Sequence, residues 1–154
     1  MKRRTFLKGS LAGSAVAVAV GAGLLTPGTV MAAWPAKAFD AKSVPDALTS
    51  LVGGSSMTDS GDISIKAPDI AENGAVVPVS VTTKLGSLES ISILADKNAS
   101  PLAASFDLGA TAQGYVSTRI KMGKTSTVIA VVKSGGKLYS AKKNVKVTIG
   151  GCGG

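Results

Sequence analysis

The chain has 154 residues, 17 basic and 9 acidic side chains, a formal net charge of +8 at pH 7 and a hydrophobic fraction of 45%. It contains no histidine and a single cysteine, which excludes the commonest general base, an internal disulfide, a thiolate zinc cluster and a Cys-x-x-Cys redox pair. No glycine-rich phosphate loop precedes a helix pattern. The length suits one domain of ordinary size, and the composition leaves little for conventional enzyme chemistry, so we expect no catalytic centre and no metal.

The first 32 residues have the pattern of a twin-arginine (Tat) export signal. A basic head that contains Arg3-Arg4 is followed by an apolar run at residues 11–25, which is too short and too rich in glycine for a good membrane-spanning helix. Val30-Met31-Ala32 then offers small or tolerated residues for signal peptidase. We therefore expect residues 1–32 to be removed and the mature protein to lie in the periplasm without a stable membrane anchor. A retained anchor is the alternative.

Removal of this signal takes away four basic residues and no acidic residue, which lowers the net charge to +4. The remaining basic excess is concentrated near the C-terminus, and with two Tyr and one Trp it argues against nucleic acid as a partner. Basic residues there favour solubility, or attract an anionic ligand or an acidic partner. The twin-arginine route carries folded cargo, and no ligand set for a cofactor is evident. We therefore expect the chain to be exported already paired with another subunit.

One helix is predicted at residues 44–52. Ser43 is a good N-cap, Asp46 completes an S-x-x-D capping pattern, and the apolar residues that follow recur at helical spacing on one face. Gly53-Gly54 ends the helix. The polar segment 55–61 is expected to be a loop.

From residue 62 onward the hydrophobic period becomes two, which is typical of half-buried strands. We expect strands at residues 63–66, 77–81, 91–95, 102–108, 115–122, 128–133 and 138–149. Gly135-Gly136 marks a hairpin turn before the last of them. Pro68-Asp69 breaks the first run. Pro78 cannot donate a ladder hydrogen bond, so its strand is expected to lie at a sheet edge or to be bulged there.

About seven short strands behind one helix predict an all-β fold, an immunoglobulin-like antiparallel β-sandwich that spans residues 33–149. A small open barrel is the alternative topology. The Cys…Trp…Cys core of true immunoglobulin domains is absent, since the only tryptophan and the only cysteine lie on either side of the strands. In the last strand, Val145, Val147 and Ile149 are expected to face inward.

The last five residues, Gly150-Gly151-Cys152-Gly153-Gly154, predict a flexible arm that holds a thiol. Three residues extend at most about 10 Å from Ile149 to Cys152, and the glycines on both sides would let the thiol enter a narrow pocket on another protein. A free cysteine is mostly neutral thiol near pH 7. With no base fixed beside it, Cys152 would depend on partners for activation. A frayed tail with an incidental cysteine is the alternative.

Four residues outside this arm also invite a functional interpretation. Arg119 and Lys121 could bind an anion, although a solvated sheet face explains them better. Tyr115 and Tyr139 suit either contact with a partner subunit or the rim of the sandwich. We name none of them as a site.

Three stretches match a known family: residues 66–74 (KAPDIAENG), 115–123 (YVSTRIKMG) and 147–154 (VTIGGCGG). Together with the leader and the strand pattern, they make the chain resemble the SoxY family, the sulfur-carrier subunits of periplasmic thiosulfate-oxidising Sox systems. The resemblance runs from the twin-arginine leader to the last residue.

This resemblance implies a covalent carrier and not an enzyme. Cys152 would bear the substrate as a cysteine S-thiosulfonate and its derivatives, and Gly150, Gly151, Gly153 and Gly154 would form the flexible arm. The implied partners are a SoxZ-like subunit in a heterodimer, a haem-containing SoxAX-type cytochrome that loads thiosulfate, a SoxB-type hydrolase that releases sulfate, and a sulfur dehydrogenase. No cofactor is implied besides the sulfur adduct itself.

Two other classes of protein would use the same cysteine differently. A thiol enzyme with Cys152 as its nucleophile is disfavoured by the missing histidine, the missing resolving cysteine and the terminal position. A structural or adhesive periplasmic β-sandwich, whose terminal cysteine only joins two chains, is the alternative function.

The leader generates the first testable prediction. Because Val30-Met31-Ala32 closes the signal, the exported protein should begin at Ala33. N-terminal sequencing of periplasmic material checks this, and recovery of chains that still begin at Met1 would contradict the export interpretation.

Overall fold

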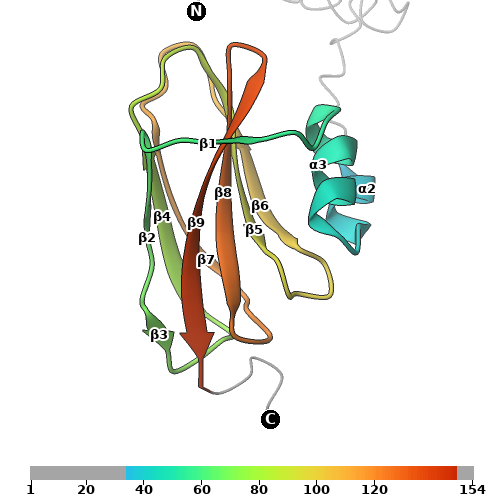
Figure 1. Cartoon of the computed structure of the whole chain (residues 1–154), viewed down its shortest axis with the longest axis vertical. Coiled ribbons are helices and arrows are strands. Elements are labelled where there is room, and N and C mark those ends of the chain that lie inside the picture. Colours follow the sequence, from blue (N-terminus) through green and yellow to red (C-terminus); the bar gives the residue numbers. More distant parts are fainter. Residues whose placement is uncertain (1–33, 149–154) are drawn as a thin grey trace, which may run out of the picture. The chain divides into compact units, whose positions relative to one another are not determined.

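The computed structural model describes residues 34–148, and residues 1–33 and 149–154 lie outside that range. The expected signal at 1–32, Ile149 and the arm at 150–154 therefore fall outside the described residues. Within the described part, two short helices precede nine strands that form two sheets (Figure 1).

The predicted helix is present as α3, Val44–Val52. Its N-cap forms as expected, because the Ser43 side chain accepts a hydrogen bond from the Asp46 backbone N–H at 3.2 Å. Gly53 ends the helix in the left-handed conformation, with φ +79°. A second helix, α2 at Ala36–Asp40, was not predicted, because five residues are too few to show a helical period.

All seven predicted strands are present. The strands are β1 Thr58–Asp59, β2 Ile63–Lys66, β3 Ile70–Ala71, β4 Val77–Thr83, β5 Leu88–Ala95, β6 Leu102–Asp107, β7 Tyr115–Ile120, β8 Ser126–Ser134 and β9 Lys137–Val147. Two of them, β1 and β3, have two residues each and were not predicted. The β8–β9 hairpin turns at Gly135 and Gly136, whose φ angles of +54° and +75° fit the glycines that the sequence places there.

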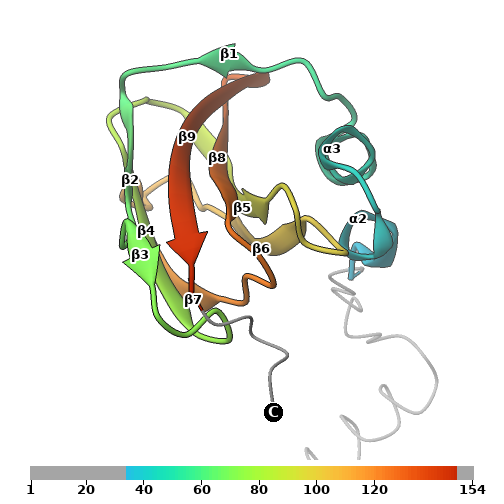
Figure 2. The same ribbon diagram turned by 60° about the horizontal axis from the view of Figure 1, so that its bottom comes forward.

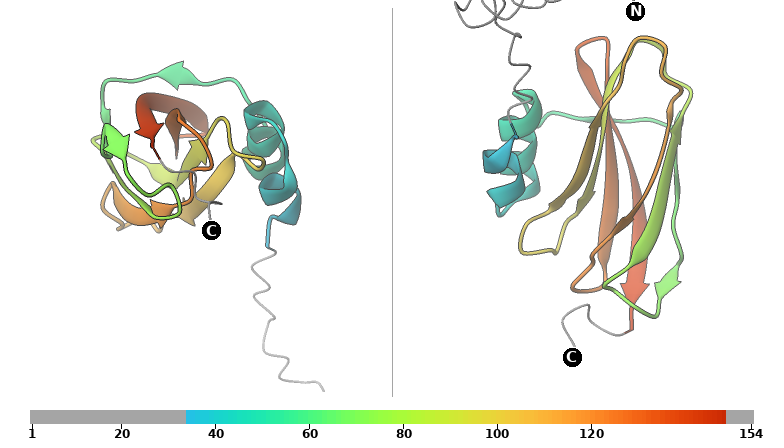
Figure 3. Two further views of the ribbon diagram at one scale, coloured as in Figure 1. Left: turned by 90° about the horizontal axis from the view of Figure 1, so that it is seen from below. Right: turned by 180° about the vertical axis from the view of Figure 1, so that it is seen from behind.

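The two sheets face each other as a sandwich (Figure 3). The larger sheet has the order β1-β9-β8-β5-β6, and β3 pairs with β9 as well; the smaller sheet has the order β2-β4-β7. The main core fills the space between them with side chains such as Val79, Ile91, Ile93, Val128 and Val145, all completely buried. The β-sandwich prediction is thus confirmed, and the open barrel is wrong because two separate sheets enclose the core.

A second, smaller core covers the outer face of the larger sheet. Leu48 of α3 and Ala38 of α2 pack there against Leu94, Ile129 and Val131. Because the helices cover one face and the smaller sheet covers the other, β5 and β8 are buried along most of their length. β8 accordingly reads as a continuous apolar run from Val128 to Val132, whereas β5 keeps its alternation and buries Ser90 and Ser92.

The segment 58–71 crosses between the two sheets and closes one side of the sandwich. It pairs in parallel with the start of β9 through β1, leaves to pair with β4 through β2, and returns to the end of β9 through β3. The expectation of a plain loop at 55–61 is therefore wrong at Thr58–Asp59. The break at Pro68-Asp69 is real but short, because pairing resumes at Ile70.

The expectation that the strand of Pro78 lies at an edge or is bulged is wrong for the strand as a whole. β4 is the central strand of the smaller sheet, and its pairing with β7 runs through Pro78↔Arg119 without a register shift. The physical reason behind the expectation holds locally, since β2 pairs with β4 only between Thr83 and Ser80. Pro78 lies beyond the last of these pairs, so its missing N–H removes no bond to β2.

Close packing at Gly114 generates a stability prediction. A Cβ there would collide with the Thr83 carbonyl oxygen and lie 2.8 Å from Thr83 Cγ2, whereas a Cβ at Gly109 in the same connection would meet nothing within 4 Å. Gly114→Ala should lower the free energy of unfolding by about 1–3 kcal/mol, and Gly109→Ala is the matched control. Urea denaturation measures both. Equal midpoints for the two variants would contradict the close packing.

Candidate functional site

Cys152, with Gly150, Gly151, Gly153 and Gly154 around it, lies outside the described residues. What the structure describes is the strand that leads into this segment, up to Thr148. The candidate site is therefore built from its base: the end of β9 and the groups that hold it.

On one side, the end of β9 is held by β3. The two strands are parallel, with Ile70 opposite Lys146 and Ala71 opposite Val147. The Lys146 N–H donates to the Asp69 carbonyl at 2.9 Å, and the Thr148 N–H donates to the Ala71 carbonyl at 3.1 Å. These bonds extend the sheet to the last described residue.

On the other edge of β9, the side chain of Thr125 bonds the strand just beyond the last residue pair with β8. β8 begins at Ser126, which pairs with Val145, and no residue of β8 lies opposite Val147. There the Val147 N–H donates to Thr125 Oγ1 at 2.9 Å, and the same hydroxyl lies 3.4 Å from the Val147 carbonyl oxygen. One hydroxyl thus satisfies both backbone groups of a residue that would otherwise fray.

The inward-facing residues of β9 confirm part of the sequence prediction. Val145 is completely buried, and Val147 is partly buried against the main core. Ile149, the third residue expected to face inward, falls outside the described residues. The strand that precedes the arm is therefore fixed by its hydrogen bonds and by its side chains.

Three of the C-terminal lysines are neutralised by carboxylates. Lys143 lies 3.1 Å from Asp69, and Lys142 and Lys133 are bound in the same way by acidic side chains. The partner of Lys142 is Asp59, whose pKa is lowered by the Ser140 hydroxyl, which donates to it, and by the lysine charge. These exposed pairs add little stability. They do reduce the positive charge that the sequence places on β9.

The other four residues considered from the sequence are placed as follows. Arg119 and Lys121 are exposed at the end of β7, and Tyr139 is partly buried against the main core. Tyr115 is 55% exposed on the outer face of the smaller sheet. Hydrogen bonds with the Ser80 and Ser117 side chains lower the pKa of its phenol.

The described residues contain neither a cluster of metal ligands nor a membrane-spanning helix. Among residues 34–148, no group of three or more His, Cys, Asp or Glu side chains lies close enough to hold a metal ion. In the same range, no helix is both long and apolar enough to cross a membrane.

The end of β9 shares one end of the sandwich with two turns (Figure 2). These are the β5–β6 turn at residues 96–101 and the β7–β8 turn at residues 121–125. The turns are tied together, because the Asn98 side chain donates to the Lys121 carbonyl at 2.7 Å and accepts from the Gly123 N–H at 3.0 Å. Sequence reasoning missed this link and that of Thr125, because a lone Asn or Thr in a turn gives no periodic signal.

Comparison with known proteins identifies a family. The family model described as "Sulfur oxidation protein SoxY" matches residues 48–152. The solved structure of the sulfur carrier protein SoxY from Chlorobium limicola f thiosulfatophilum is 47% identical to this chain, with a TM-score of 0.62 over 68% of this chain and 94% of that one. A superoxide reductase (neelaredoxin) from Ignicoccus hospitalis is 18% identical with a TM-score of 0.49, over 55% and 79% of the two chains, and this likeness carries no argument. Among curated proteins, none matches.

The Thr125 hydroxyl generates a prediction about the base of the arm. Thr125→Val keeps the shape of the side chain but leaves both backbone groups of Val147 without their partner. We expect a loss of about 1 kcal/mol in local stability and therefore roughly fivefold faster hydrogen exchange at the Val147 amide. Thr82→Val, on the exposed face of β4, is the matched control. An unchanged exchange rate at Val147 would show that Thr125 does not hold the strand.

Proposed function

Because the chain belongs to the SoxY family, we propose that it is a sulfur carrier that binds sulfur intermediates covalently on Cys152 and presents them to partner enzymes. The observation that carries the proposal is the family match, which extends to residue 152 itself. The 47% identical sulfur carrier from Chlorobium limicola supports the same role.

The construction of the C-terminal end suits a carrier. β9 is held up to Thr148 by β3 on one side and by Thr125 on the other. Three residues then separate Thr148 from Cys152, and the four Cα–Cα steps between them set an upper limit of about 14 Å between their Cα atoms whatever the path. A thiol within this reach would be available to a partner's site, while the strand behind it stays fixed.

The chemistry that we propose needs no base or cofactor in this chain. Coupling of thiosulfate to the Cys152 thiol forms an S–S bond and releases a proton and two electrons, which a SoxAX-type cytochrome accepts. Hydrolysis of the outer S–S bond by a SoxB-type enzyme then consumes one water, releases sulfate and leaves a persulfide on the cysteine. A sulfur dehydrogenase would oxidise that remaining sulfur while it stays attached.

We also propose that the chain works in the periplasm as a heterodimer with a SoxZ-like subunit, after export by the twin-arginine route with residues 1–32 removed. The twin arginines and the alanine-terminated leader support the export route. The absence of a predicted cofactor supports an assembled partner as the reason for folded export.

The proposal predicts the outcome of one substitution at the thiol. Cys152→Ser should leave the unfolding midpoint unchanged, because the residue lies beyond the last strand, and should abolish thiosulfate-dependent electron transfer in the reconstituted system. Intact-mass analysis of the unaltered chain after turnover should show adducts that a thiol reductant removes. Undiminished turnover by the Cys152→Ser protein would refute the carrier role.

Two glycine variants separate a carrier from a module that only dimerises through its cysteine. Gly151→Val and Gly153→Val add a β-branched side chain beside the thiol, which restricts the backbone and widens the segment that enters a partner. In a carrier, both should slow turnover while the thiol still titrates normally with a small reagent. A dimerising tail would tolerate both, so full turnover together with disulfide-linked dimers would favour the alternative.

A further inference from the structure

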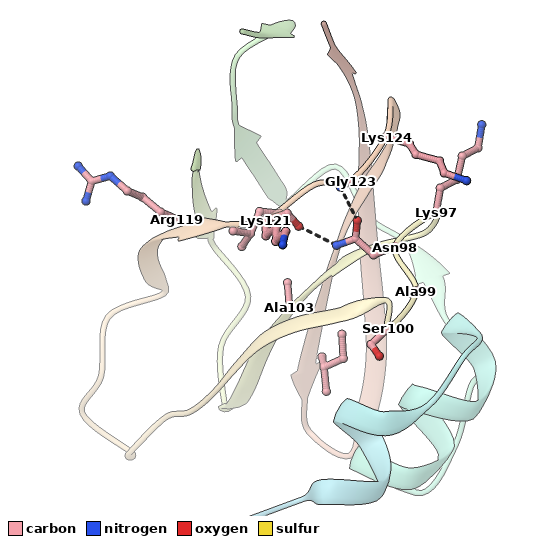
Figure 4. Close-up of a pocket in the computed structure, with 11 residues that line it drawn as sticks. Lys97, Asn98, Ala99, Ser100, Ala103, Arg119, Lys121, Gly123 and Lys124 are labelled. Carbon is pink, nitrogen blue, oxygen red and sulfur yellow. Dashed lines mark hydrogen bonds between the residues drawn. The ribbon is translucent and has the colours of Figure 1, made fainter. Parts of the chain in front are cut away.

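The sandwich is closed on one side and open on the other. The segment 58–71 closes the side along β9, but β6 and β7 are the outer strands of their sheets and lie on the opposite side. A groove of about 650 Å³ lies between them, near the end of the sandwich where β9 ends (Figure 4).

The groove has an apolar floor and a basic rim. Leu102, Ala103 and Ile120 contribute the floor, and the first and last of these are buried. Four cationic side chains line the rim: Lys97, Arg119, Lys121 and Lys124. No acidic side chain lines it. In Figure 4 the side chain of Arg119 extends to one side, those of Lys97 and Lys124 extend to the other, and Lys121 lies between them.

The charge of this rim is not offset by ion pairs, whereas Lys142 and Lys143 of β9 are paired with acidic side chains. Among residues 34–148, the ion pairs involve Lys133, Lys142 and Lys143, and none of the four rim cations takes part in one. Asp96 precedes Lys97 but does not line the groove. Its carboxylate accepts a hydrogen bond from the Thr127 N–H at 2.8 Å on the neighbouring strand.

The backbone that carries the rim cations is fixed, although lysine and arginine side chains are long and flexible. Asn98 bonds both the Lys121 carbonyl and the Gly123 N–H, which fastens the two turns that carry three of the cations. The Asn98 N–H also donates to the Ala95 carbonyl at 3.2 Å. The backbone positions of the rim are thus set before any ligand arrives.

The groove adjoins the base of the arm. Lys124 is next in sequence to Thr125, whose hydroxyl bonds the Val147 N–H at 2.9 Å. Consecutive Cα atoms lie 3.80 Å apart, so the Lys124 Cα lies within roughly 10 Å of the last strand residue. Four further residues with a reach of about 14 Å are therefore enough to bring Cys152 to the rim.

We propose that this groove binds the sulfonate end of the sulfur adduct on the chain's own Cys152. This inference rests on the proposed function, because it takes the S-thiosulfonate on Cys152 as the ligand. A sulfonate offers three acceptor oxygens and a negative charge to the rim, and the apolar floor suits the weakly hydrated sulfur atoms behind it. The rim cations, which take part in no ion pair, thus hold the loaded form, and the uncharged thiol has no such attraction.

Covalent attachment to the chain favours the bound adduct over free thiosulfate as the ligand of the groove. Contacts between an anion and exposed lysines are worth little each, so a free anion binds such a rim weakly. A short flexible linker, however, supplies its own ligand at an effective concentration in the millimolar range. The groove is therefore expected to be occupied in the loaded protein at micromolar concentration and empty in micromolar thiosulfate.

The experiment loads the purified protein chemically. The Cys152 thiolate attacks a central sulfur of tetrathionate, the new S–S bond forms as the central S–S bond of tetrathionate breaks, and thiosulfate leaves with the electron pair. Intact mass confirms the adduct. Iodoacetamide-treated protein, which carries a neutral group of similar length on Cys152, is the control. Two-dimensional ¹H–¹⁵N spectra then report the amides of Asn98, Gly123 and Lys124.

We expect shifts at these amides in the tetrathionate-loaded protein and not in the iodoacetamide control. The shifts should not change on dilution, since the contact is intramolecular, and should shrink in about 1 M salt, where the Debye length falls to about 3 Å. Lys121→Gln with Lys124→Gln should reduce them about threefold. The matched control, Lys84→Gln with Lys137→Gln at the opposite end of the sandwich, should leave them unchanged.

Three results would overturn the proposal. Identical spectra of the loaded and the neutral forms would show that the groove does not bind the adduct. Equal shifts with stoichiometric free thiosulfate on the Cys152→Ser protein would make the groove a site for the free anion. Loss of partner-dependent turnover in the Lys121/Lys124 variant without any shift in the loaded chain would assign the rim to an acidic partner protein. Because the adduct is installed chemically, the first two of these results do not depend on the turnover assay that tests the proposed function.

Discussion

Strand β9 has two long edges, and β8 pairs with one of them from Lys137 to Val145. The other edge would be a row of unpaired backbone groups if the chain did not return to it twice, at β1 and again at β3. Between these contacts the same segment supplies β2 to the opposite sheet. The pairing of one edge thus joins the two sheets, closes one side of the core and fixes the strand from which the arm emerges.

The closed and open sides of the sandwich differ in the burial of apolar residues and in the pairing of charged side chains. The closed side and the helices bury their apolar residues, and three cations of the C-terminal part are paired there with Glu89, Asp59 and Asp69. The open side between β6 and β7 keeps its cations unpaired around an apolar floor. Four cations without an ion pair among residues 34–148 are therefore gathered around one groove, near the end of the sandwich where β9 ends.

Much of this fold could be predicted from local pattern. Ser43, Asp46 and Gly53 define α3 because capping depends on neighbours three or four residues away, and the strands follow from alternation and from turns such as Gly135-Gly136. The short strands β1 and β3 could not be found in this way, since two residues show no period and their partner residues lie 81 and 76 positions further along the chain. The prediction for the strand of Pro78 was wrong because the rule for proline concerns only the hydrogen bond of its own missing N–H. β4 is long enough to pair with a second strand at other residues and so to be central.

The candidate site also has one part that the sequence pattern predicts and another part that it does not. Cys152 and its glycines are evident from the sequence, because a lone thiol between four glycines needs no tertiary information. The groups behind it are not evident. Asn98 and Gly123 come together only when antiparallel strands bring two turns to one end, and Thr125 reaches Val147 across 22 positions of sequence. Arg119 and Lys121 drew attention as charges on a strand, yet the groove that gives them a common setting arises from the gap between two sheets.

The direction in which β9 leaves the sandwich has a mechanical consequence. A pull on the end of β9 along the axis of the strand would load all nine residue pairs with β8 in shear at once. A pull from the side would break the same ladder one pair at a time, as a zipper opens. The parallel contact with β3 and the Thr125 hydroxyl are loaded first, because they lie nearest the point of pull. The strand would therefore bear a pull along its axis while the core behind it stays intact.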